Sequence, residues 1–146
     1  MGNVCVLAAY PRRSQGRWRS ILACDQLSYS LPGGPGAAAQ ARAVVTEALA
    51  PRLDEERLAD VRLLVSELVT NGVLHGDANG DEDSLTLSIA SNAVVRVDVV
   101  DHGDGFVPGA LRDPVGGWGL ILVEELADRW GVTRDGETRV WFEMAA

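Results

Sequence analysis

Residues 54–76 read DEERLADVRLLVSELVTNGVLHG, and this stretch decides the fold. Its first residue, Asp54, can cap a helix, and Glu55 and Glu56 place negative charge where the helix dipole favours it. The apolar side chains that follow recur with the helical period, at Leu58, Val61, Leu64, Val65 and Leu68. The stretch therefore predicts a long helix that packs one apolar face into a core.

The last turns of this predicted helix are unfavourable by intrinsic propensity. Thr70, Asn71 and Gly72 all lower helix stability, and glycine does so by about 1 kcal/mol relative to alanine. Positions where local preference is given up are candidates for function. Glu67, Asn71 and His75 are spaced four apart, so they form a polar stripe on one side of the helix.

This polar stripe has two interpretations. In the functional one, Asn71 offers its side-chain oxygen to Mg²⁺, a cation that prefers oxygen ligands and bridges substrate phosphates. Glu67, one turn earlier, then accepts a proton from an attacking water or hydroxyl. In the structural one, the stripe is a solvent-facing helix end, and His75 is a cap or a loop contact. Taken alone, the helix favours the structural interpretation.

A glycine-containing loop follows a predicted strand at residues 101–105. Asp101 comes where the strand leaves the sheet, so its carboxylate can accept hydrogen bonds from a ligand amino group. Gly103 and Gly105 permit positive φ and the close approach of a ligand. Alternatively, D-x-G-x-G is a common loop spacing, and Asp104 is only a solvated turn residue.

A second glycine loop, residues 116–119, precedes a helix predicted to begin at Leu120. A helix N-terminus presents free N–H groups and a positive dipole to a phosphate. All 13 basic residues are arginine, which excludes a P-loop with its lysine. The helix N-terminus would take the place of that lysine. The alternative is a flexible connector followed by a helix.

The rest of the chain predicts strands and two more helices. The strands occupy residues 27–31, 85–89, 94–100, 131–134 and 138–143, and the other helices occupy residues 37–50 and 120–127. This order predicts an α+β two-layer sandwich, a mainly antiparallel or mixed sheet of four to five strands with three helices on one face. Residues 1–26 have no clear period and form an unassigned N-terminal segment, so the domain comprises residues 27–146.

Composition limits the classes of function. The net charge of −8 argues against direct nucleic-acid binding, which needs a basic surface. No apolar run is long enough to cross a bilayer, and the N-terminus lacks the basic residues of a secretory signal. Two cysteines are too few for a disulfide framework. We therefore expect a cytoplasmic protein that binds neither nucleic acid nor membrane.

Three motifs, in this order, resemble the N, G1 and G2 boxes of the GHKL ATPase/kinase superfamily. They are SELVTN at residues 66–71 with HG at 75–76, DxGxG at 101–105, and GxGL at 117–120. The chain is most similar to the small anti-sigma-factor serine/threonine kinases, from about Leu27 to Glu143. The resemblance implies the histidine kinase-like ATPase fold, with ATP and Mg²⁺ as cofactors.

The resemblance also implies a role for each matching residue. Glu67 would be the general base and Asn71 the Mg²⁺ ligand. Asp101 would bind the adenine amino group, and Gly103 and Gly105 would shape its pocket. The remaining nucleotide-binding residues implied in this way are Gly117, Gly119 and Leu120 at the phosphates and Thr138 in the nucleotide pocket.

Two features depart from the family pattern. The segment between the glycine loops, residues 106–115, is short for an ATP lid, and its Arg112 can reach a phosphate or face solvent. Trp118 stands where a smaller or more polar residue is expected. These departures leave the turnover rate open.

The implied function is that of a kinase that phosphorylates a small anti-anti-sigma (STAS-type) protein and binds a sigma factor. The alternative is a non-catalytic, nucleotide-gated binding module, against which the presence of Glu67 argues. A histidine sensor kinase is a weaker third alternative, because the chain has no helical hairpin with a phospho-acceptor histidine. The resemblance allows a homodimer, for which these residues identify no interface.

Overall fold

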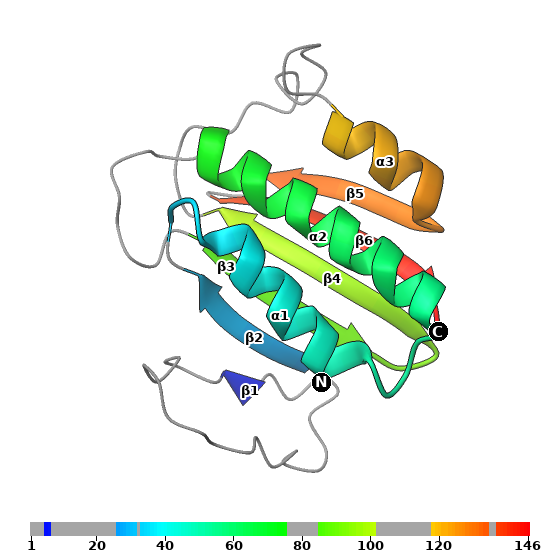
Figure 1. Ribbon diagram of the computed structural model, residues 1–146. Helices are drawn as coiled ribbons and strands as arrows, with labels where there is room; N and C mark the ends of the chain where they lie inside the picture. Colours follow the sequence, from blue (N-terminus) through cyan, green and yellow to red (C-terminus); the bar gives the residue numbers. More distant parts are fainter. Residues whose placement is uncertain (1–4, 7–25, 32, 76–84, 102–117, 135–136) are drawn as a thin grey trace.

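A computed structural model describes residues 5–6, 26–31, 33–75, 85–101, 118–134 and 137–146. The elements are β1 (Cys5–Val6), β2 (Gln26–Leu31), α1 (Ala37–Leu49), α2 (Glu55–His75), β3 (Leu85–Ser91), β4 (Val94–Asp101), α3 (Trp118–Leu126), β5 (Arg129–Arg134) and β6 (Thr138–Ala145). The strands form one sheet in the order β1-β2-β3-β4-β6-β5, and the three helices cover one of its faces (Figure 1). The predicted α+β two-layer fold is confirmed.

All neighbouring strands in the part of the sheet β2-β3-β4-β6-β5 are antiparallel, in agreement with the predicted four to five strands. A short sixth strand, β1, pairs in parallel with β2, where Cys5 lies opposite Leu27 and Val6 opposite Ser28. It belongs to the N-terminal segment that had no predicted structure. Two residues are too few to show the alternation from which strands are predicted.

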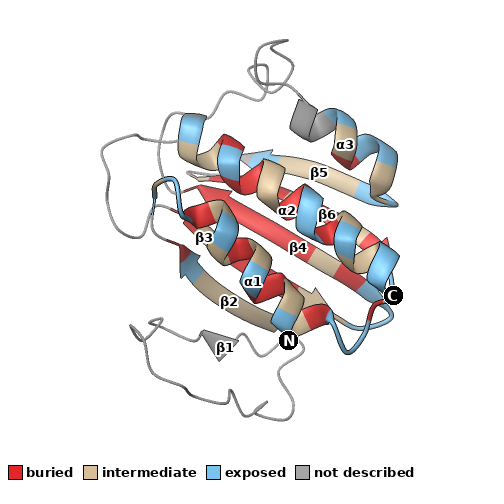
Figure 2. Ribbon diagram, in the orientation of Figure 1, coloured by how far each residue is buried: buried red, intermediate tan, exposed pale blue. Residues whose placement is uncertain are grey.

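The core lies between the helices and the sheet face toward them (Figure 2). Alternate residues of β4 and β6, among them Val97, Val99, Val140 and Phe142, are buried there. Val99 pairs with Val140, and Val97 with Phe142, across the two strands. The predicted apolar face of α2 packs above them. Its buried side chains are Val61, Leu64, Val65, Leu68 and Val69.

The start of α2 follows the prediction, and that of α3 does not. Asp54 caps α2, since its Oδ1 accepts a hydrogen bond of 2.8 Å from the backbone N–H of Arg57. Helix α3 begins at Trp118, two residues before the predicted Leu120. The first N–H groups of a helix have no intrahelical partner. The poor propensity of Gly119 therefore counts less there than in a helix interior.

Gly72 has a packing reason for its place inside α2. A Cβ atom at Gly72 would lie 2.9 Å from Cδ2 of Leu85 on β3, closer than two carbon atoms can approach. Leu85 in turn pairs with Asp101 at the end of β4. The missing side chain thus lets the last turns of α2 approach the strands at the end where β4 finishes.

The opposite face of the sheet carries a charged network centred on Arg96. Its guanidinium donates to Asp98 over 3.1 Å and to Glu143 over 3.3 Å, and its Cζ lies 4.2 Å from the centre of the Trp141 ring. The hydrogen bond to Asp98 is the main cause that raises the pKa of Arg96. The Trp141 ring also covers Gly131 of β5, where a Cβ atom would come within 2.8 Å of the indole.

Candidate functional site

A small cavity lies between the C-terminal half of α2 and the adjoining ends of β4 and β6. The residues that line it are Leu68, Asn71, Gly72, Val99, Asp101, Thr138 and Val140. Three of these, Asn71, Asp101 and Thr138, are polar and were predicted from the sequence as site residues. All three are buried, with exposed fractions of 5%, 4% and 6%. The cavity of about 10 Å³ has room for about one water molecule, so these residues form only one wall of a nucleotide site.

Strand pairing brings Asp101 and Thr138 together. Asp101 is the last residue of β4, Thr138 is the first of β6, and they are direct partners in the antiparallel ladder. The Cβ atoms of such partners lie about 5 Å apart on the same face. Two residues further into the sheet, Val99 and Val140 form the next pair on that face. The cavity floor therefore has a polar end and an apolar end.

Asn71 reaches the cavity from above, on α2. Among the described residues, its Nδ2 has no hydrogen-bond partner, although the atom is buried. An unsatisfied buried donor costs about 1–3 kcal/mol, so native structures keep few of them without a reason. A ligand oxygen in the cavity would satisfy Nδ2. Turning the carboxamide by 180° would present Oδ1 to a cation instead, so the residue fits either a phosphate or Mg²⁺.

Glu67 lies one helical turn before Asn71, on the same side of α2. Its side chain is half-buried and is not among the residues that line the cavity. The structure thus brings Asn71, Asp101 and Thr138 together and leaves Glu67 beside them along the helix. His75 is the last residue of α2, and its side chain lies outside the described part of the chain.

The predicted glycine residues are described only in part. Gly103, Gly105 and Gly117 lie outside the described residues, as do Arg112 and the whole segment 106–115. Gly119 and Leu120 belong to the first turn of α3, and the surroundings of these two residues lie outside what the structure describes. The described structure therefore does not test these positions as parts of the site.

Four residues that line the cavity were not predicted as site residues. They are Leu68, Gly72, Val99 and Val140. The signal that identifies them is periodicity. Leu68 precedes Asn71 by three residues on the helix, and each valine lies two residues from a predicted polar residue, on the same face of its strand.

The described side chains offer few ligands for a metal ion. In the described ranges, no group of three His, Cys, Asp or Glu side chains is arranged to hold a metal ion. Asn71 alone would leave most of the coordination of Mg²⁺ to phosphate oxygens and water, as this cation usually requires.

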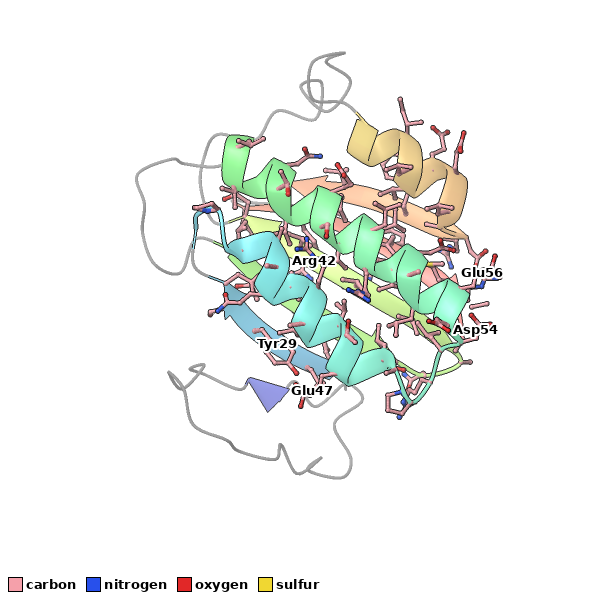
Figure 3. The ribbon with its side chains drawn as sticks, viewed as in Figure 1. Tyr29, Arg42, Glu47, Asp54 and Glu56 are labelled. Carbon is pink, nitrogen blue, oxygen red and sulfur yellow. The ribbon has the colours of Figure 1, made fainter. Side chains whose placement is uncertain are left out.

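Away from the cavity, the phenol of Tyr29 on β2 is perturbed. Burial raises the pKa of this phenol, and the negative charge of Glu47 on α1 raises it further by a smaller amount. Both residues are labelled in Figure 3.

No helix within the described ranges is both long enough and apolar enough to cross a membrane.

Comparison with known proteins agrees with this architecture. The model of the histidine kinase-like ATPase domain family matches residues 31–144. A search of curated proteins finds no match. The structure of the RsbU and RsbW domains of Rv1364c from Mycobacterium tuberculosis is similar, with 26% identity and a TM-score of 0.67. That match covers 82% of this chain and 32% of the other, so this chain spans about a third of that protein's length.

Two further solved structures show a likeness in fold alone. A chain of the SiaB–SiaC complex from Pseudomonas aeruginosa has 14% identity and a TM-score of 0.61, over 81% of this chain and 88% of that one. The blue-light activated histidine kinase EL346 of Erythrobacter litoralis has 21% identity and a TM-score of 0.52, over 78% and 42%. Because the family model extends from the end of β2 through all three helices to β6, this chain belongs to the histidine kinase-like ATPase domain family.

Proposed function

We propose that the chain binds Mg·ATP at the cavity between α2, β4 and β6 and transfers the γ-phosphoryl group to a hydroxyl of a partner protein. Membership of the histidine kinase-like ATPase family implies ATP binding. One observation carries the proposal. Asn71, Asp101 and Thr138 come from three different elements and meet, buried, at one cavity.

The floor of the cavity suits adenine. The base is flat and largely apolar, and its exocyclic amino group needs an acceptor. Asp101 supplies a carboxylate, and Thr138 lies beside it with a hydroxyl that can donate or accept. Apolar walls with few polar groups are typical of such sites. Here the apolar part comes from Leu68, Val99 and Val140.

The phosphates would extend toward Asn71 and the start of α3. Helix α3 begins at Trp118, inside the second glycine motif, and its first N–H groups and dipole favour negative charge. When bound, Mg²⁺ would neutralise charge on the phosphates, with Asn71 as its protein ligand. Gly103 and Gly105 near the adenine, and Gly117, Gly119 and Leu120 near the phosphates, remain parts of the proposed site.

Glu67 is the proposed general base. From one turn before Asn71 it would accept a hydrogen bond from the attacking hydroxyl and hold the proton on a carboxylate oxygen. Catalysis of phosphoryl transfer otherwise consists of positioning and charge stabilisation. Glu67 is only half-buried and lies outside the cavity, so a hydroxyl of an approaching partner can reach its carboxylate.

The proposed phosphate acceptor is a serine or threonine of a small anti-anti-sigma protein of the STAS type, with a sigma factor as the second partner. The GHKL motifs and the similarity to a structure that contains an RsbW domain support this choice. The chain would then act as an anti-sigma serine/threonine kinase. A homodimer remains compatible with this role.

One observation favours a second candidate function, the non-catalytic, nucleotide-gated binding module. Glu67 does not line the cavity, and Asp101 is the only carboxylate among the residues that do. In a module of this kind, ATP would set the shape of a partner-binding surface without transfer.

The variant Glu67→Ala distinguishes the two functions. We expect it to bind Mg·ATP with an affinity within about 3-fold of wild type and to lose at least 100-fold in transfer from γ-labelled ATP, the contribution of a general base. Glu125→Ala on the exposed side of α3 is the matched control and should keep both properties. Partner proteins are identified by nucleotide-dependent capture from the native cell, followed by mass spectrometry of the phosphorylated proteins. A wild-type chain that captures a partner with ATP but never phosphorylates it would instead be a binding module.

A further inference from the structure

A hydrogen bond joins α1 to α2 at the turn before the candidate site. Nη1 of Arg42 on α1 donates to Oγ of Ser66 on α2 over 2.8 Å. Arg42 is half-buried and lies between the two helices (Figure 3). Ser66 immediately precedes Glu67 and comes just over one turn before Asn71.

The contact stands out because its surroundings are apolar. Among the described residues, the buried side chains of both helices are apolar except for Asn71. They are Ala37, Ala41, Val44, Val45 and Leu49 on α1, and Val61, Leu64, Val65, Leu68 and Val69 on α2. Apolar attraction is not directional, so it allows one helix to slide or turn against the other. A hydrogen bond from a charged donor has a narrow geometry and resists both movements.

Movement of α2 would displace the candidate site. Asp101 and Thr138 are fixed to each other by the sheet ladder, whereas Glu67 and Asn71 move with α2. One residue of a helix spans about 1.5 Å along its axis, and an error of about 1 Å at a reacting group costs about 100-fold in rate. The position of α2 therefore decides whether its two polar residues act on the ligand that the strands hold.

We propose that Arg42 is a positioning residue for phosphoryl transfer. Through Ser66 it fixes α2 against α1 and so places Glu67 and Asn71 over the ends of β4 and β6. The inference rests on the proposed function, since it concerns the same site. It requires no contact between Arg42 and nucleotide or partner, and this separates it from a docking role for the same arginine.

Three single variants, and the double variant that combines Arg42→Met with Ser66→Ala, test the contact. Arg42→Met keeps the alkyl stem that packs between the helices and removes the donor. Ser66→Ala removes the acceptor, and Arg42→Lys restores a charged donor. The control is Arg62→Met, which removes an exposed arginine of α2 that has no hydrogen-bond partner among the described residues.

The first readout is transfer of labelled γ-phosphate from Mg·ATP to a captured partner, and to water where none is captured. We expect kcat to fall about 10-fold in both Arg42→Met and Ser66→Ala, with KM for ATP within about 2-fold. The double variant should fall no further, Arg42→Lys should recover part of the loss, and Arg62→Met should match wild type. A loss in Arg42→Met that Ser66→Ala does not share, or losses that multiply in the double variant, would overturn the proposal.

The second readout needs no transfer. With Mg·ATP bound, amide hydrogen exchange at residues 67–71 should become about 10-fold faster in both Arg42→Met and Ser66→Ala, and should not change at residues 58–62. If wild type transfers phosphate to neither protein nor water, the proposed function fails, while this measurement still decides whether the contact fixes the position of α2. Unchanged exchange at residues 67–71 in both variants would refute it.

Discussion

Replacing Asn71 by leucine should stabilise the nucleotide-free protein while abolishing the binding of Mg·ATP. The Asn71 side chain is 5% exposed, and its Nδ2 has no partner among the described residues. Removing an unsatisfied buried donor recovers about 1–3 kcal/mol. Leucine has the same number and branching of side-chain heavy atoms and a better helix propensity, by about 0.5 kcal/mol. For a domain of this size the gain corresponds to about 3–10 °C in Tm.

Thermal unfolding with and without ligand measures both halves of this prediction. For wild type, Mg·ATP at 100 times its Kd should add about 2.7 kcal/mol to the free energy of unfolding. Asn71→Leu should unfold at a higher temperature than wild type without ligand and should show no shift with Mg·ATP. Metal-free ATP separates the two roles of the carboxamide, because loss of a Mg²⁺ ligand weakens binding of Mg·ATP more than binding of metal-free nucleotide.

Two results would refute this reasoning. If Asn71→Leu unfolds at a lower temperature than wild type, the carboxamide stabilises the folded chain and is not kept for a ligand. If the variant shows the same Mg·ATP shift as wild type, the nucleotide does not bind at this cavity. Asn71→Ala is the control for shape. It should lose the ligand shift as well, but the cavity it leaves should offset the gain in stability.

Two other substitutions probe the rest of the molecule. Gly131→Ala should destabilise the fold by about 1–3 kcal/mol in urea unfolding, because the new Cβ atom comes within 2.8 Å of the rigid Trp141 ring, and a change below about 0.5 kcal/mol would contradict that packing. Tyr29 has a raised pKa from burial and, to a lesser extent, from Glu47. The folded state therefore holds this proton to higher pH than the unfolded state, and stability falls as the pH rises past the ordinary value of 10.0. Tyr29→Phe should remove that part of the decline, and an unchanged pH dependence between 9 and about 11 would count against the perturbed phenol.

The elements of the fold could be predicted because each has its own period. The apolar spacing and the Asp54 cap predict α2, and alternation predicts the core faces of β4 and β6. The predicted start of α3, Leu120, is two residues late, because the predicted glycine loop includes Gly119 and glycine carries a helix-propensity penalty. That penalty is reduced at a helix N-terminus, where the N–H groups have no intrahelical partner in any case.

Contacts between distant elements could not be predicted in the same way. The pairing of Asp101 with Thr138 depends on β6 lying beside β4, and α3 and β5 come between these strands in the chain. Asp101 was recognised from a motif and Thr138 from the family resemblance, but their adjacency is a property of sheet order. The hydrogen bond from Arg42 to Ser66 likewise depends on how two helices cross, which no local pattern contains.

The weak end of α2 has two separate causes, at Gly72 and at Asn71. Gly72 is explained by packing, because a Cβ atom there would lie 2.9 Å from Cδ2 of Leu85. Asn71 has no such packing explanation, since its buried Nδ2 finds no partner among the described residues. The two are coupled all the same, because Leu85 pairs with Asp101. Gly72, Asn71 and Asp101 line the same cavity, so the close approach of α2 to β3 at Gly72 also brings the carboxamide of Asn71 to the cavity at the end of β4.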